Sequence, residues 1–305
     1  MEQLNTQKSG FVAVCGRPNV GKSTLMNHLI GQKIAITSNK PQTTRKQIRT
    51  IYTDARGQVI FLDTPGIHKP KNQLGRYMDE AAYSTLEQSD LILWLVEPGE
   101  TVGKGDTEIQ NRLKASGKPV ILVINKTDLA SRELVQKTEE VYGGLMDFAA
   151  IQKVCALRGV RTKELMDTIF GLLPYGPMYY DEDSVTDETM RQIAAEIIRE
   201  KALRDLRDEV PHGIAVLIDS MKERPDGSLM DIEASIICEK DSHKGIVIGR
   251  GGEMLRRIGS DARPDIEEMC GMHVNLKLFV KVRKDWRDNP TYLRSFGYEE
   301  KDLKK

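Results

Sequence analysis

One eight-residue segment near the N-terminus limits the fold of this chain more than any other. It reads Gly-x-x-x-x-Gly-Lys-Ser and comprises Gly16, Arg17, Pro18, Asn19, Val20, Gly21, Lys22 and Ser23. The apolar run 11–15 before it is typical of a buried strand, and residues 24–31 have the pattern of a helix closed by a glycine. A glycine loop between a strand and a helix directs backbone N–H groups and the helix dipole at an anion. We therefore expect a phosphate-binding loop on an α/β sheet.

Two polar side chains at the end of this loop carry the expected chemistry. Lys22 is placed to reach the β- and γ-phosphates of a nucleotide, and the Ser23 hydroxyl is placed to ligate Mg²⁺. The loop by itself does not reveal which nucleotide binds, nor what the energy of that nucleotide is used for.

The composition limits the class of protein in which this loop works. The chain has 305 residues, enough for about two domains with separate cores. Lys and Arg together number 45, as do Asp and Glu, so any basic surface for nucleic acid has to be local. Residues 1–8 lack the apolar core of a signal peptide, and no apolar run approaches the roughly twenty residues of a membrane span. We therefore expect a cytoplasmic protein.

The first part of the chain alternates stretches typical of strands and of helices. Continuous apolar runs suit strands that are buried on both faces of a sheet, and helical patterns separate them. The runs lie at 59–62, 91–96 and 120–124, and the helical patterns lie at 75–88, 106–116 and 132–142. Residues 45–53 and 57–62 are expected to form an antiparallel hairpin with a turn at 54–57. The predicted fold class is α/β, with a mixed and mostly parallel sheet flanked by helices.

The pattern changes after residues 173–177, where two prolines and a glycine interrupt a helix. We expect a nucleotide-binding domain at 1–178, a linker at 179–186 and a second domain at 187–305. A long helix is predicted over 186–208, with its N-cap at Thr186 or Asp187. Two strands at 213–222 and 229–240, one or two helices, and a last strand at 273–282 follow it. The second domain is therefore α+β, in the order α-β-β-α-α-β.

A second motif follows the predicted strand 59–62 and comprises Asp63, Thr64, Pro65 and Gly66. An aspartate at the carboxyl end of a strand, opposite the glycine loop, suits a contact to Mg²⁺ through water. The Gly66 N–H is placed for a γ-phosphate oxygen. The segment that begins at Ile67 is therefore expected to sense hydrolysis.

A third motif, Asn125, Lys126, Thr127 and Asp128, follows the predicted strand 120–124. The Asp128 carboxylate can accept two hydrogen bonds from guanine, whereas adenine would leave it unpaired at a cost of about 1–3 kcal/mol. Lys126 can lay its methylene stem over the base, and Asn125 is expected to tie this loop to the phosphate loop. The motif therefore predicts a guanine nucleotide.

Two further segments complete the expected site. Ala156, after Cys155, has a backbone N–H placed for guanine O6. Residues 42–45 form a polar stretch between the first helix and the hairpin, where a threonine hydroxyl can complete the Mg²⁺ shell only when a γ-phosphate is present. Thr44 is the preferred ligand, and Thr43 stays open as its alternative.

With these five segments in order, the chain resembles the translation-factor-class GTPases, and its motifs are similar to their Era and tRNA-modification branch. The resemblance implies GTP and GDP as ligands, hydrolysis of GTP to GDP and phosphate, and catalytic roles for Lys22, Thr44 and Asn19. In relatives of this branch the asparagine that matches Asn19 can ligate K⁺, which acts like an arginine finger.

Cys155 departs from the serine usual in the base loop. Ile67 stands where Ras-like proteins carry the water-orienting glutamine, so slow intrinsic hydrolysis is expected.

A second glycine loop, Gly249, Arg250, Gly251 and Gly252, lies between two predicted short helices. Glycines there let a nucleic-acid backbone approach closely, and Lys244, Arg250, Arg256 and Arg257 add positive charge. The loop and the element order resemble a KH domain of the second topological type, whose usual ligand is single-stranded RNA. Basic residues also alternate with apolar ones along the last strand, at Lys277, Lys281, Arg283 and Lys284, as an RNA-binding or a solvated face. Trp286 is interpreted as a core residue.

A GTPase domain followed by a C-terminal KH domain resembles the Era-like GTPases over essentially the whole chain. That resemblance implies a monomeric switch that binds the 3′ end of small-subunit ribosomal RNA and acts in 30S subunit assembly. It also implies loose peripheral association with the inner membrane. A scaffold in which GTP is only structural, and a GTPase acting on another RNA, stay open as alternatives.

Overall fold

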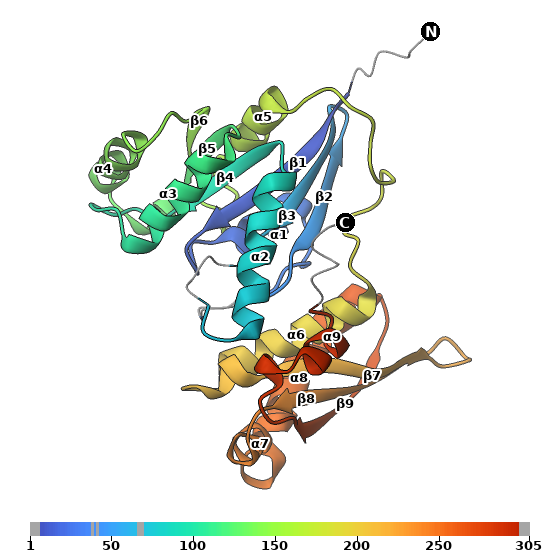
Figure 1. Ribbon diagram of the computed structural model, residues 1–305. Coiled ribbons are helices and arrows are strands. Elements are labelled where there is room, and N and C mark those ends of the chain that lie inside the picture. The colour runs from blue at the N-terminus through green and yellow to red at the C-terminus, as the bar shows by residue number, and fades with distance from the viewer. Residues whose placement is uncertain (1–6, 38–39, 41–42, 66–69, 299–305) are drawn as a thin grey trace.

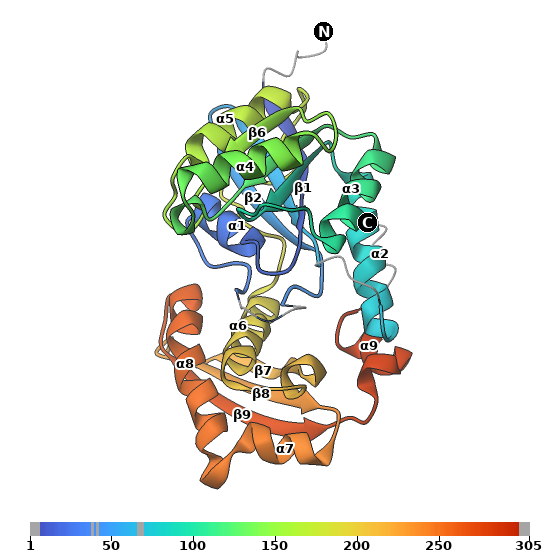
Figure 2. The same cartoon turned by 90° about the vertical axis from the view of Figure 1, so that its left-hand side faces the viewer.

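The computed structural model describes residues 7–37, 40, 43–65 and 70–298, and within them the chain forms two bodies (Figures 1 and 2). The N-terminal body contains a six-stranded sheet, and the C-terminal body contains a three-stranded sheet. Helix α6 (Met190–Asp205) lies between the two sheets (Figure 2). The α/β and α+β classes expected for the two parts of the chain are confirmed.

The large sheet has the strand order β2-β3-β1-β4-β5-β6. Only β2 is antiparallel to its neighbour, so the predicted hairpin within a mostly parallel sheet is confirmed. The last strand, β6, is a short edge strand that the sequence pattern did not predict. The strands are β1 (Lys8–Gly16), β2 (Ile48–Asp54), β3 (Gly57–Asp63), β4 (Leu91–Val96), β5 (Val120–Ile124) and β6 (Ala150–Lys153).

Helices cover both faces of this sheet, which explains the unbroken apolar runs of its central strands. Along β1, Val12 and Val14 face one core and Ala13 and Cys15 face the other, all of them fully buried. The first core also contains residues of α1 and α5, and the second contains residues of α2, α3 and α4. These helices are α1 (Lys22–Ile30), α2 (Gln73–Gln88), α3 (Lys104–Ser116), α4 (Arg132–Gly143) and α5 (Thr162–Leu172).

The small sheet has the order β7-β8-β9, with β7 antiparallel and β9 parallel to the central strand. Helices α6 and α8 contribute to the core on one face of this sheet. The predicted order α-β-β-α-α-β is confirmed, and a short α9 follows it. The elements are β7 (Ala215–Glu223), β8 (Met230–Cys238), α7 (Asp241–Ile248), α8 (Glu253–Cys270), β9 (Val274–Val282) and α9 (Pro290–Ser295). None of the helices in the described residues could cross a membrane.

Two predicted helices have different bounds in the structure. Helix α6 begins at Met190 behind a capping box of Thr189 and Gln192, so the predicted N-cap at Thr186 or Asp187 is wrong. Both of those side chains contact β2 instead: the Thr186 hydroxyl donates to the Arg49 carbonyl at 2.7 Å, and Asp187 pairs with the Arg49 side chain. Helix α8 has 18 residues and is not the short helix expected after the second glycine loop.

The segment predicted as a linker binds to the edge of the large sheet. The Ile51 N–H donates to the Val185 carbonyl at 2.9 Å, which adds this segment beside β2. Gln58 accepts from the N–H groups of Tyr179 and Tyr180. The connection between the two bodies is therefore held to the sheet by a backbone hydrogen bond and by the Gln58 side chain.

The two bodies also share an apolar core. Helix α2 contributes Leu74, Tyr77 and Met78, and these pack with Trp286 and Leu293 from the C-terminal segment. Figure 2 shows α9 beside the lower end of α2. Trp286 is completely buried, which confirms its interpretation as a core residue.

The close approach of β1 and β3 at Gly57 makes a stability prediction. Gly57 has a φ of 140°, and a Cβ there would lie 1.8 Å from the Lys8 carbonyl oxygen. Gly57→Ala should lower the free energy of unfolding by roughly 1–3 kcal/mol, since it adds backbone strain at this position. Urea unfolding followed by circular dichroism measures the change. The control is Gly171→Ala in α5, where a Cβ has open space and the helix should gain about 0.5–1 kcal/mol. Equal stabilities of the two variants would contradict the prediction.

Candidate functional site

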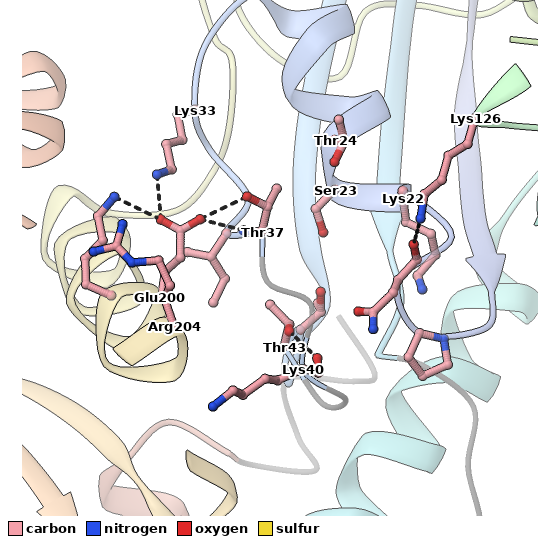
Figure 3. Close-up of a pocket in the computed structure, with 16 residues that line it drawn as sticks. Lys22, Ser23, Thr24, Lys33, Thr37, Lys40, Thr43, Lys126, Glu200 and Arg204 are labelled. Carbon is pink, nitrogen blue, oxygen red and sulfur yellow. Dashed lines mark hydrogen bonds and ion pairs between the residues drawn. The ribbon is translucent and has the colours of Figure 1, made fainter. Parts of the chain in front are cut away.

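The carboxyl ends of β1, β3 and β5 bring three predicted motifs to one edge of the large sheet. A cavity of about 610 Å³ lies at this edge, and the loop between β1 and α1 forms one of its walls. The segment between α1 and β2 contributes a second wall, through Lys33, Ile36, Thr37, Lys40, Thr43 and Thr44, and α6 contributes a third (Figure 3). The site is therefore lined by both bodies of the chain.

The conformation of the β1–α1 loop requires its glycines. Gly16 and Gly21 have φ values of 147° and 99°. A Cβ at Gly16 would lie 2.4 Å from the Leu95 carbonyl oxygen, and one at Gly21 would lie 2.2 Å from Nδ2 of Asn125. Asn19 is also left-handed, with a φ of 68°, a conformation that asparagine adopts more readily than most residues. Pro18, Asn19 and Gly21 line the cavity.

Lys22 lies inside this loop and is only 7% exposed. Its ammonium donates to the carbonyl oxygens of Gly16 and Arg17 at 3.1 and 3.2 Å. Burial lowers the pKa of Lys22, and the nearby Asp63 carboxylate opposes that shift. A buried ammonium beside the cavity suits a phosphate partner, so the role predicted for Lys22 stays consistent with its position.

Two loop residues face away from the expected ligand. The Arg17 guanidinium pairs with Asp106 of α3, with Nε 3.0 Å from a carboxylate oxygen that also accepts from the Tyr142 hydroxyl. Only the backbone of Arg17 is therefore left for the nucleotide contact predicted for this residue. Val20 packs in the apolar core, 1% exposed, and its carbonyl accepts from Asn125.

Three oxygen ligands meet behind the loop. The hydroxyls of Ser23 and Thr44 both donate to Oδ2 of Asp63, at 3.1 and 3.2 Å. The other carboxylate oxygen, Oδ1, is buried without a hydrogen-bond partner among the described residues. Two hydroxyls and a carboxylate with an unused oxygen match the hard oxygen ligands that Mg²⁺ prefers. The residues present therefore fit the predicted metal site.

The structure also bears on the choice between Thr43 and Thr44. The Thr43 hydroxyl donates to the Lys40 carbonyl at 2.6 Å, whereas the Thr44 hydroxyl is directed at Asp63. This arrangement favours Thr44 as the metal ligand. Of the remaining motif residues, Thr64 donates to the Val14 carbonyl at 2.9 Å and Pro65 is buried. Gly66 and Ile67 lie outside the described residues.

The Asn125 side chain joins the loops as predicted. Its Nδ2 donates to the Val20 carbonyl at 2.8 Å, and its Oδ1 accepts from the Ala156 N–H at 2.9 Å. That N–H is the group we assigned to guanine O6, so the structure gives it a different partner. Ala156 acts here by fixing Asn125, and its contact with the base stays a prediction.

The residues predicted to contact the base, 126–128, are held in place by hydrogen bonds and ion pairs with neighbouring residues. The Lys126 ammonium donates to the Asn19 carbonyl at 2.6 Å and pairs with Glu97. Asp128 lies 3.5 Å from Nε of Arg158, and its hydrogen bond with Cys155 adds to burial in raising the pKa of that thiol. The Thr127 hydroxyl donates to the Val154 carbonyl at 3.1 Å. Residues 126–128 are thus ordered around the point where the base is expected.

The sequence motifs missed one wall of the cavity. Glu200 of α6 accepts from the Thr37 N–H and hydroxyl at 2.8 and 3.0 Å, and from the Lys33 ammonium at 2.5 Å (Figure 3). Lys33 also binds Asp265 of α8 at 2.6 Å. Lys201 and Arg204 complete this wall. These contacts join residues far apart in the chain that belong to no motif, so no sequence signal identified them.

The second glycine loop begins where α7 ends, and α7 lies at the lower end of the small body in Figure 1. Gly249, Gly251 and Gly252 have φ values of 74°, 60° and 80°, and a Cβ at Gly249 would meet Met254 at 2.7 Å. The basic side chains assigned to RNA are exposed, and they are Lys244, Arg250, Arg256 and Arg257. Arg257 also lies 3.4 Å from Asp205.

The basic residues of β9 are less available for RNA binding, because acidic side chains pair with two of them. Lys277 lies 3.7 Å from Glu233, and Lys281 lies 3.3 Å from Asp219. The first pair joins the neighbouring strands β8 and β9, and the second reaches from β9 across β8 to β7. The pairing favours the interpretation of this strand as a solvated face over a second RNA surface.

The large, mostly parallel sheet carries a phosphate loop, a base loop of the type that reads guanine, and a candidate Mg²⁺ site of Ser23, Thr44 and Asp63, which we call the metal corner. These features define a P-loop GTPase domain, and the glycine loop between α7 and α8 defines a KH domain. Family models agree: "50S ribosome-binding GTPase" matches residues 11–126 and "KH domain" matches residues 209–287. GTPase Era of Clostridium botulinum (strain Eklund 17B) is 51% identical over 96% of this chain and 99% of its own length. GTPase Era of Lacticaseibacillus paracasei is 52% identical over 99% of this chain and all of its own length. The chain belongs to the GTPase Era family and is a GTPase.

Solved structures of Era have the same fold over both domains. An Aquifex aeolicus Era variant bound to GDP and AlF4⁻ is 41% identical, with a TM-score of 0.91 over 96% of this chain and 99% of its own. A second Era structure, with MgGDPNP and nucleotides 1506–1542 of 16S ribosomal RNA, has the same identity, TM-score and coverage. The two-domain architecture is therefore that of the family.

The base-contact assignment of Asp128 makes a specificity prediction. Asp128→Asn should weaken GTP binding by about 10–100-fold, because two charge-assisted hydrogen bonds are lost. It should also shift preference toward xanthosine triphosphate, since an amide N–H₂ can donate to the second xanthine carbonyl. Binding titrations with both nucleotides measure the shift. Asp147→Asn, at an exposed aspartate after α4, is the control. An unchanged preference in Asp128→Asn would place the base elsewhere.

Proposed function

We propose that this protein is a GTP-dependent switch that binds the 3′ region of small-subunit ribosomal RNA and acts in assembly of the 30S subunit. One observation carries the proposal: a single cavity is lined by the phosphate loop, by the segment that holds Thr44, and by α6 of the KH domain. A nucleotide in this cavity has direct contact with the domain that binds RNA. The position of that domain can therefore depend on the nucleotide.

The RNA assignment has two supports. The exposed glycine loop and its basic neighbours have the composition that clamps about four nucleotides of a single strand. The Era structure of the same architecture contains nucleotides 1506–1542 of 16S ribosomal RNA. A chain that is 41% identical to it over both domains is expected to bind the same class of RNA.

The residues of the cavity have distinct roles in GTP hydrolysis. The β1–α1 loop and Lys22 bind the phosphates, and Ser23, Thr44 and Asp63, the last through water, would hold Mg²⁺. Bound Mg²⁺ supplies charge neutralisation at the β- and γ-phosphates. The protein contributes positioning and electrostatic stabilisation, and no covalent intermediate is needed.

The Glu200 contacts give the switch a physical basis. Thr37 and Lys33 belong to the segment that leads to Thr44, and Glu200 holds both of them to α6. Any nucleotide-dependent movement of this segment must change three hydrogen bonds to a carboxylate that is mostly buried. Hydrolysis would thereby change how the KH domain sits on the GTPase domain, and RNA would be released.

Potassium dependence is the prediction for Asn19. Its position on the cavity wall beside the phosphate loop suits a ligand of K⁺, which would supply positive charge next to the phosphates. GTP turnover should be faster in potassium than in sodium buffer, by about tenfold or more. Asn19→Gly keeps the left-handed backbone without strain and removes the side chain, so it should abolish this difference. Equal turnover of the unchanged protein in both buffers would exclude the role.

The experiment that tests the function is crosslinking to cellular RNA followed by sequencing, with the protein loaded either with a non-hydrolysable GTP analogue or with GDP. We expect a footprint at the 3′ region of small-subunit ribosomal RNA, at least severalfold stronger with the analogue. An Arg250→Glu variant, with the charge of the glycine loop reversed, should lose the footprint and keep nucleotide binding.

The other outcomes separate the alternatives. A footprint scattered over messenger RNA would exclude the ribosomal assignment. Equal footprints with the analogue and with GDP would exclude the switch and favour a scaffold in which GTP is only structural.

A further inference from the structure

Arg45 is a charged residue of the GTPase domain that is almost fully buried against the KH domain. It follows Thr44 directly, yet its side chain lies within the KH domain and is only 2% exposed. The two neighbours therefore contact different parts of the molecule. The Thr44 hydroxyl reaches Asp63 at the metal corner, and the Arg45 guanidinium reaches the start of β7.

The contact at β7 uses three successive backbone carbonyls. Arg45 donates to His212 from NH2 at 3.0 Å and to Ile214 from NH1 at 2.6 Å. The carbonyl between them, that of Gly213, accepts from the indole N–H of Trp286 at 2.9 Å. The Arg45 guanidinium also lies over the Trp286 ring, 5.8 Å from its centroid. Two donors in a fixed planar fork specify both the distance and the orientation of residues 212–214.

A second arginine holds the other side of the same segment. Arg199 of α6 is 1% exposed, and it donates to the Thr43 carbonyl. Glu196, one turn earlier in α6, neutralises it through a contact of 2.6 Å. Residues 43 and 45 are therefore both bound to the KH domain, and Thr44 lies between these two anchors.

Ordinary packing does not account for this arrangement. Burial and the neighbouring Arg199 charge lower the pKa of Arg45, and its Nε has no hydrogen-bond partner among the described residues. An apolar side chain would fill a domain contact without these costs. What the arginine adds is a directional link between the β7 backbone and the residue beside the metal corner.

We propose that Arg45 is a positioning residue that sets the Thr44 hydroxyl at the metal corner according to where the KH domain sits. The inference rests on the proposed role of Thr44 as a Mg²⁺ ligand in the GTP-bound protein. A displacement of residues 212–214 would pull on Arg45 and move Thr44 away from Asp63. The KH domain thus controls the part of the site that distinguishes GTP from GDP, since only the γ-phosphate state uses Thr44.

The test replaces Arg45 in the full-length protein. Arg45→Lys keeps a positive charge but loses the fork, and Arg45→Gln also removes the charge. Both should lower kcat for GTP by about 10–100-fold, as expected for a misplaced catalytic ligand. KM for GTP and the affinity for GDP should change by less than about threefold, because the phosphate and base loops stay intact. Arg49→Gln is the matched control, since Arg49 lies four residues on and its guanidinium pairs with the Asp187 carboxylate at 3.2 Å.

A double-mutant cycle with Thr44→Ala separates positioning from folding. If Arg45 acts through Thr44, Arg45→Lys should cause almost no further loss of kcat in the Thr44→Ala background. Additive losses, or a parallel loss of GDP affinity, would show a merely structural role and overturn the inference. If Arg45→Gln melts at a lower temperature than the unchanged protein, Arg45→Lys alone decides the cycle.

The same cycle distinguishes failure of the inference from failure of its premise. If Thr44→Ala leaves kcat unchanged, Thr44 is not the ligand, and the premise and this inference fail together while the proposed RNA-binding function still stands on the crosslinking test. If Thr44→Ala lowers kcat while Arg45→Lys does not, only the inference fails.

Discussion

The nucleotide site depends on one buried amide. Asn125, 1% exposed, spans the gap between the carbonyl of Val20 in the phosphate loop and the N–H of Ala156 in the base loop. Both partners are buried backbone groups that would otherwise lack hydrogen bonds, so the bridge is costly to break. A Cβ at Gly21 would collide with this amide. The amide thereby links the geometry of the phosphate loop to that of the base loop.

The segment between α1 and β2 has the opposite character. Several of its anchors lie on the KH domain: Glu200 binds Thr37, Arg199 binds the Thr43 carbonyl, and Arg45 binds the backbone before β7. Others lie on the GTPase domain, since Asn27 of α1 accepts from the N–H groups of Ile34 and Ala35. A loop that is held in part by another domain can be displaced when that domain moves. The two loops joined by Asn125 can therefore keep the nucleotide while residues 33–45 respond to the KH domain. A switch requires one part of the site that holds the nucleotide rigidly and another part whose position can change.

Most of the fold could be predicted from the sequence because its signals are local. Apolar runs gave the strands of the large sheet, and the spacing around Gly16–Ser23 placed the phosphate loop. The N-cap of α6 was wrong because Thr186 and Asp187 bind Arg49, a tertiary contact with no local signal. The roles of Glu200 and Arg199 could not be predicted for the same reason: each is an ordinary helical residue whose partner lies more than 150 positions away. Ala156 was assigned a base contact from its motif, which does not show that Asn125 already accepts from its N–H.

The contacts between residues 33–45 and the KH domain also limit how strongly GTP binding and RNA binding can be coupled. GTP can favour one position of the KH domain relative to the GTPase domain, and RNA can prefer the same position. In that case GTP raises the affinity for RNA, and RNA must raise the affinity for GTP by the same factor. The size of that factor is limited by the free energy of the contacts that differ between the two positions of the KH domain. Here those contacts are polar and partly buried, and each hydrogen bond to a charged group contributes about 1.5–3 kcal/mol. Loss of even one of these hydrogen bonds can change the population ratio of the two domain positions by about tenfold or more. In the proposed switch, the contacts of Thr37, Thr43 and Arg45 with the KH domain would be enough to transmit the nucleotide state, without any change in the core of either domain.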